Sequence, residues 1–277
     1  MSAQRRTVAI AGLAIEYDWI DADAGTPDGA PLMVFLHEGL GSTAMWKDFP
    51  ARLCQALGFR GLVYSRPGYG RSTPRAANER WSTDFMHRQA IEVLPALLAA
   101  LGTEQSPATR QRLWLFGHSD GASIALIYAA HFSDRLAGAV VVAPHSFVED
   151  IAIASIERAC DAYANQGLRA RLARWHDDVD SAFHGWSQAW LDPAFRDWTL
   201  MPELESIGCP LLAVQGVDDE YGTMAQIAII EHAVPGTTVV ALEACGHSPH
   251  RDQTDAVIGA VSRWITTLLN TPAPSPQ

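Results

Sequence analysis

The sequence has few cysteines and no long apolar run, and both absences narrow what the protein can be. Its four cysteines stand far apart, without the spacing of metal ligands or the density of a disulfide framework; they are Cys54, Cys160, Cys209 and Cys245. Reduced thiols in a cytoplasmic protein are therefore the simplest expectation. No apolar stretch is long enough to span a bilayer, so no membrane-embedded segment is expected.

Positive charge is also scarce. The chain carries 20 Lys and Arg residues against 31 Asp and Glu residues, which gives a formal net charge of −11. Nucleic acids and anionic membrane surfaces are bound through a positive field, so this balance argues against both as partners. A small-molecule substrate fits the composition better.

At 277 residues the chain is long enough for one large α/β domain with an inserted segment. Two arginines precede an apolar run near the start, which faintly resembles a secretion signal, but residues 16–19 alternate like a strand and no small-residue cleavage site stands out. We expect two antiparallel opening strands instead, at 7–11 and 14–19. Residues 271–277 are rich in proline and are expected to be disordered.

Between the two ends, apolar runs of strand length alternate with helical patterns, as in a mostly parallel sheet covered by helices on both faces. The expected strands are 32–36, 61–64, 112–116, 136–142, 210–214 and 238–242. The expected helices are 44–57, 84–101, 119–131, 221–234 and 252–269.

This alternation is interrupted once, over residues 145–207, where no strand-like run occurs and Trp, Arg, Asp and Ala predominate. We interpret this stretch as a helical cap inserted over the sheet edge. The cap would divide the α/β core into a first part, 1–144, and a second part, 208–270.

A candidate nucleophile stands in the segment 117–121, Gly-His-Ser-Asp-Gly, which directly follows an apolar run and directly precedes a helical pattern. This G-x-S-x-G arrangement places Ser119 on a tight strand-to-helix turn. There the hydroxyl is lifted from the backbone, and the helix N-terminus favours developing negative charge. Gly117 and Gly121 avoid collisions with the neighbouring strand and helix. The alternative is that Ser119 only caps the helix.

Carboxylates and a histidine follow later strand runs. Asp218 and Asp219 come after a buried-strand run that ends at Gly216, and His247 comes after the run 238–242. Each lies at the carboxyl end of a strand, where open parallel sheets generally hold their ligands. The order Ser, Asp, His therefore predicts one catalytic site at this edge.

The chain resembles a serine hydrolase of the α/β-hydrolase superfamily over nearly its whole length. Besides the G-x-S-x-G turn, residues 36–42 are similar to the family's His-Gly oxyanion loop, 64–72 to its Asp-x-x-Gly-x-Gly-x-Ser loop and 246–249 to its closing Gly-His motif. Two positions depart from the family's pattern: Glu38 stands where glycine is usual, and Ser65 where aspartate is common.

A serine hydroxyl needs a base within hydrogen-bond reach, and imidazole has a suitable pKa, so we assign Ser119 as nucleophile and His247 as base. A carboxylate must hold the imidazole in the right tautomer. The family pattern Gly-x-x-Asp selects Asp219 as this acid, in preference to Asp218 and Glu220.

The negative oxygen formed on attack needs two preorganised N–H donors. One should be the backbone N–H of Asp120, directly after the nucleophile. By resemblance the other should be the backbone N–H of Gly39, with that of Glu38 as the alternative. His37 is expected to shape this loop through a hydrogen bond.

Four residues are candidates for contact with substrate: Glu38, His145, Trp186 and Trp190. The two tryptophans and Phe183 recur at helical i, i+3, i+7 spacing, so they share a face that either packs the cap or lines an apolar pocket. His145 follows a strand at the mouth of the site. Glu38 is expected to point outward into solvent, unless it contacts substrate or a water.

Four arginines form a basic stretch in this acidic chain: Arg66, Arg71, Arg75 and Arg80. A solvated or ion-paired loop is the default interpretation. The sharper hypothesis is that one or more of them bind a substrate carboxylate or a coenzyme A phosphate.

Together these features predict a cytoplasmic serine hydrolase that cleaves an ester, thioester or lactone of a small organic acid through an acyl-enzyme. Neither metal nor cofactor is expected, because His250 could pair with His247 but no third ligand has sensible spacing. The alternatives are hydrolysis of a carbon–carbon bond in a ring-cleavage product, and a hydrolase-like ligand-binding receptor.

Overall fold

The computed structural model describes residues 6–20, 29–76, 78–103 and 112–270, so the proline-rich stretch 271–277 lies outside it. Its centre is an eight-stranded sheet in the order β1-β2-β4-β3-β5-β6-β7-β8. The strands are β1 (Thr7–Ile10), β2 (Leu13–Ile20), β3 (Leu32–Leu36), β4 (Arg60–Tyr64), β5 (Leu113–His118), β6 (Gly138–Val142), β7 (Leu211–Gly216) and β8 (Thr238–Leu242). The β1–β2 and β2–β4 pairs are antiparallel and the others parallel, which confirms the predicted mostly parallel sheet.

The central strands are continuous apolar runs because helices bury both of their faces. Every residue of β3, β5, β6 and β7 is buried. The register pairs Leu36 with Gly117 and Gly216 with Leu242, so neighbouring strands end at one edge of the sheet. The loops that leave this edge carry the predicted site residues.

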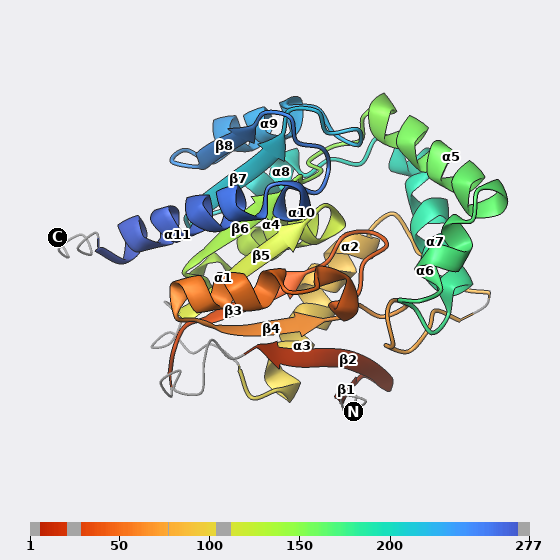
Figure 1. The fold of residues 1–277 in the computed structure, drawn as a ribbon, viewed down its shortest axis with the longest axis horizontal. Helices are drawn as coiled ribbons and strands as arrows, with labels where there is room; N and C mark the ends of the chain where they lie inside the picture. Colours follow the sequence, from red (N-terminus) through yellow and green to blue (C-terminus); the bar gives the residue numbers. More distant parts are fainter. Residues whose placement is uncertain (1–5, 21–28, 77, 104–111, 271–277) are drawn as a thin grey trace.

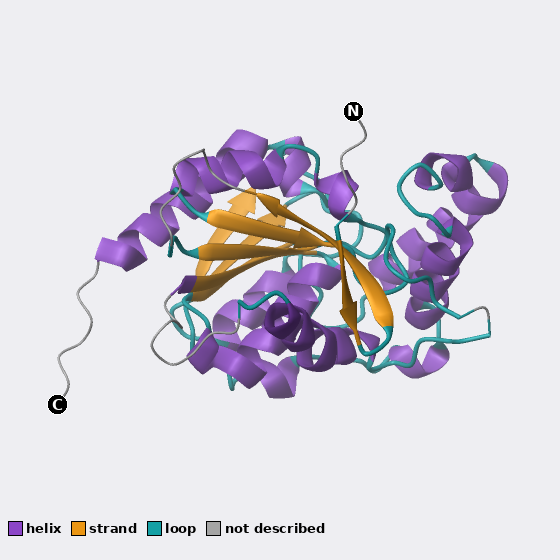
Figure 2. Ribbon diagram, turned by 90° about the horizontal axis from the view of Figure 1, so that it is seen from below, coloured by secondary structure: helices purple, strands orange, loops and turns teal. Residues whose placement is uncertain are grey.

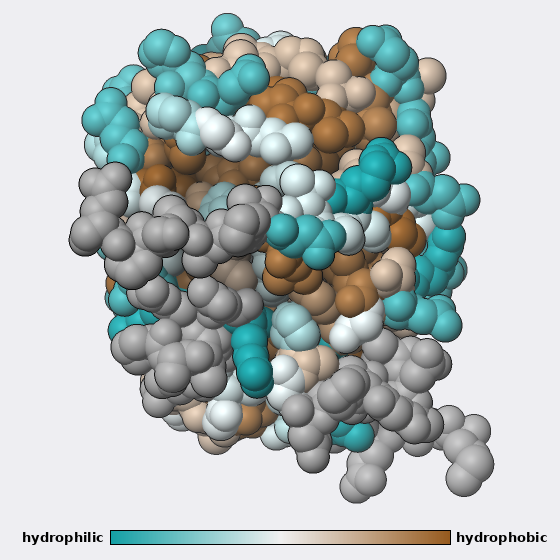
Figure 3. Space-filling model, turned by 90° about the vertical axis from the view of Figure 1, so that its left-hand side faces the viewer, coloured by the Kyte–Doolittle hydropathy of each residue, from teal (hydrophilic) through white to brown (hydrophobic). Residues whose placement is uncertain are grey.

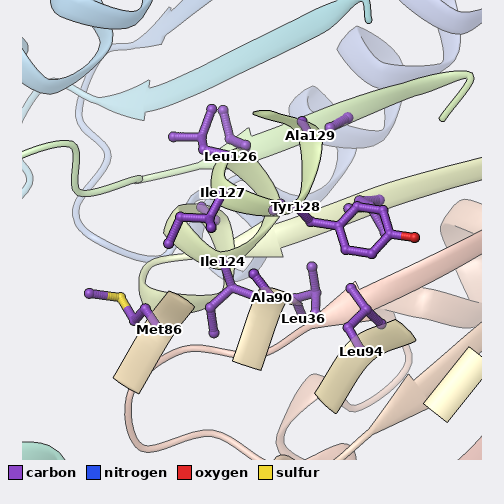
Figure 4. Close-up of a cluster of buried hydrophobic side chains, with 14 of the residues drawn as sticks. Leu36, Met86, Ala90, Leu94, Ile124, Leu126, Ile127, Tyr128 and Ala129 are labelled. Carbon is purple, nitrogen blue, oxygen red and sulfur yellow. The ribbon is translucent and has the colours of Figure 1, made fainter. Parts of the chain in front are cut away.

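Helices cover the sheet on both sides (Figure 2). On one face lie α1 (Phe49–Leu57) and α11 (Thr254–Asn270), which share a buried cluster with the strands. The other face is covered by α2 (Phe85–Arg88), the π-helical turn η2 (Gln89–Val93), α3 (Leu94–Ala100), α4 (Asp120–Phe132) and α9 (Ala225–Ala233). Figure 4 shows the heart of this second cluster, where Ile124 and Ile127 of α4 lie against Leu36 and Ala90.

Between β6 and β7 the chain forms α5 (Asp150–Asn165), α6 (Leu168–Leu172), α7 (Val179–Trp190), the short turn η5 (Pro193–Phe195) and α8 (Met201–Leu204). In Figure 1, α5, α6 and α7 gather at the right-hand end of the molecule, beside the loops that follow the parallel strands. The opposite end, shown in Figure 3, carries apolar patches interspersed with polar residues. Within the stretch predicted as a cap, α5, α6 and α7 thus lie beside the strand-end loops, whereas α8 packs in the buried cluster that includes α4.

Several predicted helices have different bounds in the structure. The helix expected over 44–57 is divided, because Lys47 has a φ of 52° and separates a 3-10 turn, η1 (Thr43–Trp46), from α1. The helix expected from residue 252 is likewise preceded by a separate turn, α10 (Pro249–Asp252). Over the described residues, no helix combines the length and the apolar character needed to cross a membrane.

Candidate active site

The serine of the G-x-S-x-G motif lies on a sharp turn between β5 and α4. Ser119 has φ 54° and ψ −122°, a strained conformation for a residue with a side chain. Its N–H donates to the carbonyl of Val142 at 2.9 Å, which ties the turn to β6. A side chain at Gly117 would overlap the backbone of Gly121, and one at Gly121 would overlap the carbonyl of Leu36. The two glycines therefore permit the turn that lifts the Ser119 hydroxyl out of the backbone.

The structure brings the three predicted triad residues into one hydrogen-bonded chain. His247 Nε2 lies 2.9 Å from Ser119 Oγ, and His247 Nδ1 lies 2.8 and 2.9 Å from the two carboxylate oxygens of Asp219. An ionised carboxylate only accepts hydrogen bonds, so Nδ1 carries the proton and Nε2 has its lone pair toward the serine. In this arrangement the imidazole can accept the hydroxyl proton.

Asp219 is held in place by donors other than the histidine. Its carboxylate accepts hydrogen bonds from Gln215 Nε2 at 2.8 Å and from the backbone N–H groups of Tyr221 and Gly222 at 2.8 and 3.2 Å. Burial raises the pKa of Asp219, but the hydrogen bond and charge of His247 outweigh burial and leave the pKa below its ordinary value. The carboxylate is therefore ionised at neutral pH.

The neighbouring carboxylates do not contact the imidazole. Asp218 is exposed, and its backbone N–H donates to the carbonyl of Cys245 at 3.0 Å. Glu220 Oε2 accepts a hydrogen bond from the backbone N–H of His247 at 3.2 Å. Glu220 thus contacts the loop that carries the histidine, whereas Asp219 contacts the ring.

The loop after β3 carries a peptide group whose orientation is fixed by three hydrogen bonds. The carbonyl of Glu38 accepts from His37 Nδ1 at 2.7 Å, from Arg66 Nη2 at 2.8 Å and from the Gly41 N–H at 3.0 Å. In a trans peptide the N–H points opposite to the carbonyl. The Gly39 N–H, which belongs to this peptide, is therefore directed away from the three donors.

His37 acts in this network as a neutral imidazole. Its Nε2 accepts from the backbone N–H of Arg66 at 3.0 Å, while its Nδ1 donates to the Glu38 carbonyl. Burial and the Arg66 charge hold the pKa of His37 well below its usual range, in keeping with one donor and one acceptor nitrogen. The predicted shaping of this loop by His37 corresponds to these two bonds.

The side chain of Glu38 is not directed outward, so that expectation is wrong. It is 19% exposed, and its Oε2 lies 3.6 Å from Nδ1 of the buried His118. Burial raises the pKa of Glu38, but the neighbouring histidines, His118 foremost and then His250 and His37, bring the pKa far below its ordinary value. The contact with the buried His118 thus accompanies the inward orientation of the carboxylate.

His118 was not among the predicted site residues, although it directly precedes Ser119. Its Nε2 donates to the carbonyl of His247 at 2.7 Å. Together with the Glu38 contact, this bond links the loop after β3, the serine turn and the histidine loop. The only signal in the sequence was the position of His118 beside the nucleophile.

The arginines of the basic stretch have different environments. Arg66 is only 1% exposed; its Nη2 lies 3.7 Å from Asp120 Oδ2, and its guanidinium lies over the ring of Tyr69 at 4.6 Å. Of the two environments expected, Arg66 therefore has the ion-paired one and is not solvated. Arg71 is exposed and lies 3.8 Å from a Glu16 oxygen, as an ion pair. The other two line a separate hollow: Arg75 and Arg80.

A cavity of about 250 Å³ opens above the serine turn. Its lining includes Ser119 and His247 together with every residue predicted as a candidate substrate contact, namely Glu38, His145, Trp186 and Trp190. The helix α5 adds Ala152 and Ile156, so the cap and the loops at the strand ends enclose it together. Its volume is suited to a small organic molecule.

The two cap tryptophans contact the predicted oxyanion donors. Trp190 Nε1 donates to Asp120 Oδ1 at 3.1 Å, and burial raises the pKa of Asp120. The indole of Trp186 fills the space where a side chain at Gly39 would lie. The face shared by these tryptophans on α7 is therefore both packed and part of the cavity wall.

The described part of the chain contains no group of three or more His, Cys, Asp or Glu side chains arranged as metal ligands. His250, considered above as a partner of His247, is buried beside two aromatic rings. Its ring centroid lies 5.0 Å from that of Trp46 and 5.4 Å from that of Phe49.

The chain matches one protein-family model and superposes on several solved structures. Residues 33–260 match a family model described as the Alpha/beta hydrolase family. Among solved structures, proline iminopeptidase of Mycobacterium smegmatis superposes with a TM-score of 0.75 at 16% sequence identity, covering 96% of this chain and 98% of that one. The enol-lactonase of Burkholderia xenovorans LB400 superposes with a TM-score of 0.69 at 20% identity, covering 94% and 100%.

A curated relative matches over part of the chain. It is the chloroplastic protein PHYLLO of Arabidopsis thaliana, 27% identical over 162 residues, which are 56% of this chain. The match spans only 9% of the length of that relative. At these identities the solved structures establish the fold alone.

Proposed function

This chain belongs to the α/β hydrolase family, and we propose that it is a serine hydrolase that cleaves an ester, thioester or lactone of a small organic acid. The observation that carries the proposal is the hydrogen-bonded chain from Asp219 through His247 to Ser119, at the base of a cavity of about 250 Å³. A serine nucleophile, a histidine base and a carboxylate that orients the base are a set of groups that performs acyl transfer.

In the first half-reaction, Ser119 Oγ attacks the substrate carbonyl carbon while His247 Nε2 takes the hydroxyl proton. The ionised Asp219 keeps the imidazole in the competent tautomer and stabilises its positive charge. The negative oxygen receives hydrogen bonds from the backbone N–H groups of Asp120 and Gly39. Losing one such donor typically raises the barrier by about 2.7–4 kcal/mol.

The tetrahedral intermediate then collapses, and the bond between the carbonyl carbon and the leaving oxygen or sulfur breaks. His247 returns its proton to the departing alcohol or thiol, leaving an acyl group on Ser119. In the second half-reaction His247 takes a proton from water, which attacks the acyl carbon. The bond between this carbon and Ser119 Oγ then breaks, and His247 gives the proton to Oγ, which releases the acid and the free serine.

The structural likenesses guide the choice of substrates to test. Likeness to an enol-lactonase supports including lactones, and likeness to a proline iminopeptidase supports including a prolyl amide. The acidic net charge of −11 favours a soluble small molecule over nucleic acid or an anionic membrane as the partner.

The proposal is tested with aryl esters, acyl thioesters and lactones, using wild type and Ser119→Ala. We expect hydrolysis of at least one of these classes, and a kcat lower by several orders of magnitude in the variant, since removal of the serine in another serine hydrolase costs roughly 10⁶-fold. A variant with wild-type kcat would contradict the assignment of Ser119.

Two further outcomes would replace the proposal by its rivals. Turnover of a chromogenic dienone by wild type, without turnover of esters, thioesters or lactones, would favour carbon–carbon bond hydrolysis. Folded wild-type protein that fails to react with a fluorophosphonate at Ser119 would favour a ligand-binding receptor.

A further inference from the structure

The cavity above Ser119 contains a buried polar side chain that has no partner. His145, in the loop after β6, is 3% exposed and lines this cavity. Its Nδ1 is enclosed by protein and makes no hydrogen bond, and Nε2 has no partner either among the residues that the structure describes. Because Nδ1 is enclosed by protein, Nε2 is the unpaired nitrogen that a molecule in the cavity can reach.

The position of His145 is fixed by its surroundings. Its backbone N–H donates to Ser123 Oγ at 3.2 Å, and the Ser123 hydroxyl donates to its carbonyl at 2.7 Å. The imidazole packs edge-on against Trp190 with ring centroids 4.9 Å apart, and 5.7 Å from the ring of His247. The ring is therefore held beside the catalytic imidazole, with Nε2 as the nitrogen left for a bound molecule.

The charge around the cavity indicates what kind of group would bind there. Burial, and secondarily the charge of His247, lower the pKa of His145 to about 3, so its imidazole is neutral at physiological pH and offers one donor and one acceptor. The lining also includes the carboxyl groups of Glu38, Asp120 and Glu220, against the single guanidinium of Arg251. A neutral hydroxyl or carbonyl group fits this environment better than an anion.

We propose that His145 hydrogen-bonds a hydroxyl or oxo group on the acyl part of the substrate, so that hydroxyacyl or oxoacyl esters are the preferred class. The inference rests on the proposed hydrolase function. The acyl part is assigned because it stays on Ser119 within the enclosed cavity while the alcohol departs toward solvent. His145 then acts as a specificity-determining residue, separate from the nucleophile and its base.

The test compares phenyl butanoate with phenyl 3-hydroxybutanoate, which differ by one hydroxyl, in wild type and in His145→Leu. Wild type should favour the hydroxyacyl ester in kcat/KM by tenfold or more, because a polar group built to bind a hydroxyl is left unpaired by the analogue that lacks it. The Leu variant should lose this preference, so that the ratio of kcat/KM for the two esters falls toward one.

Two more variants serve as a conservative replacement and as a control in this comparison. His145→Gln retains a donor and an acceptor, so it should preserve part of the preference, and it replaces the Leu variant if the latter does not fold. His131→Leu removes an exposed histidine at the end of α4 and should behave as wild type.

The outcomes separate this inference from the proposed function. Equal kcat/KM for both esters in wild type, or an undiminished preference in His145→Leu, overturns the role of His145 while leaving serine hydrolysis intact. If wild type hydrolyses neither of these esters and also fails to hydrolyse the aryl esters, thioesters and lactones, the proposed function itself is overturned.

Discussion

At the scale of single residues, the Glu38 carbonyl explains why a buried arginine lies beside the candidate site. Arg66 Nη2 donates to this carbonyl at 2.8 Å, and the guanidinium is 1% exposed. A positive donor on the carbonyl polarises the whole peptide, which makes the Gly39 N–H a stronger donor on the other side. Arg66 is therefore expected to act on the oxyanion through the peptide group, without touching the substrate.

This role predicts a specific kinetic effect of Arg66→Met. A hydrogen bond to a charged group is worth about 1.5–3 kcal/mol, so kcat should fall roughly ten- to a hundredfold while KM changes little. Affinity for a boronic acid that forms a tetrahedral adduct with Ser119 should fall in parallel. The measurement is steady-state kinetics with active sites counted by fluorophosphonate labelling.

The control for this variant is Arg71→Met, which removes an exposed arginine of the same loop. It should leave both constants close to wild type, because an exposed ion pair contributes little. A rise in KM for acidic substrates in Arg66→Met, with kcat preserved, would instead favour the direct recognition of a carboxylate considered from the sequence.

The sequence predicted those site residues that lie in short motifs. Ser119, Asp219 and His247 each follow a strand run within a few residues, so local pattern and chain order were enough to select them. The inward turn of Glu38 and the burial of Arg66 depend on contacts between loops far apart in the chain. No local pattern encodes such contacts, so Glu38 was expected to be solvated and Arg66 to lie in a solvated or ion-paired loop.

At the scale of elements, strands were predicted more accurately than helix ends. The strand positions follow from apolar runs that are buried on both faces. Helix ends depend on single polar groups: the helix expected from residue 221 begins only at Ala225, whose N–H donates to the Thr223 hydroxyl at 3.2 Å. Pro95, which lacks an N–H, stands at the junction of η2 and α3 and accounts for the π-helical turn there.

The contact between the cap helix α7 and the oxyanion loop gives a prediction at this scale. A methyl group at Gly39 would overlap the Trp186 indole, so Gly39→Ala must displace either the helix or the loop. We expect kcat to fall by about tenfold or more, since one misplaced oxyanion donor costs a few kcal/mol. Trp186→Ala in the same chain should restore much of the loss, because it removes the overlapping ring.

A double-mutant cycle measures this coupling. The single variants, the double variant and wild type are compared by kcat on one ester, with Gly208→Ala as the control, because a methyl group there meets only ordinary contacts. Purely additive effects of Gly39→Ala and Trp186→Ala would show that the cap and the oxyanion loop act independently.

At the scale of the whole molecule, several buried imidazoles lie where the cap, the loops and the sheet edge meet. Burial is the largest cause of a lowered pKa at four of them: His37, His145, His176 and His250. His37 and His176 make loop contacts, as when His176 bonds the Gly70 N–H at 2.9 Å and the Leu40 carbonyl at 3.0 Å, His145 lines the cavity, and His250 packs against Trp46 and Phe49. Closing the site over the sheet thus requires that these rings stay neutral.

This requirement predicts that the free energy of unfolding falls in mild acid. In the unfolded chain a histidine takes up a proton near pH 6.5, whereas the folded protein resists protonation until the pH reaches the lowered values, about 3 for His145. The unfolded state therefore binds more protons below pH 6.5, and stability is lost as the pH falls from there. Below pH 6.5 each such histidine lowers the free energy of unfolding by up to about 1.4 kcal/mol per pH unit. The raised pKa of Asp120 has the opposite effect on the free energy of unfolding as the pH falls.

Urea unfolding at pH 7.5, 6.5 and 5.5 measures how the free energy of unfolding depends on pH. We expect each buried histidine to lower stability by only a few tenths of a kcal/mol between the first two values and by about 1 kcal/mol between the last two, so His145→Leu should reduce the second fall by about 1 kcal/mol. The control is the exposed His131→Leu, which should leave the slope unchanged. Equal stability of wild type at pH 6.5 and 5.5 would mean that water reaches these imidazoles in the folded protein, and the enclosed, neutral His145 on which the acyl preference depends would be wrong as well.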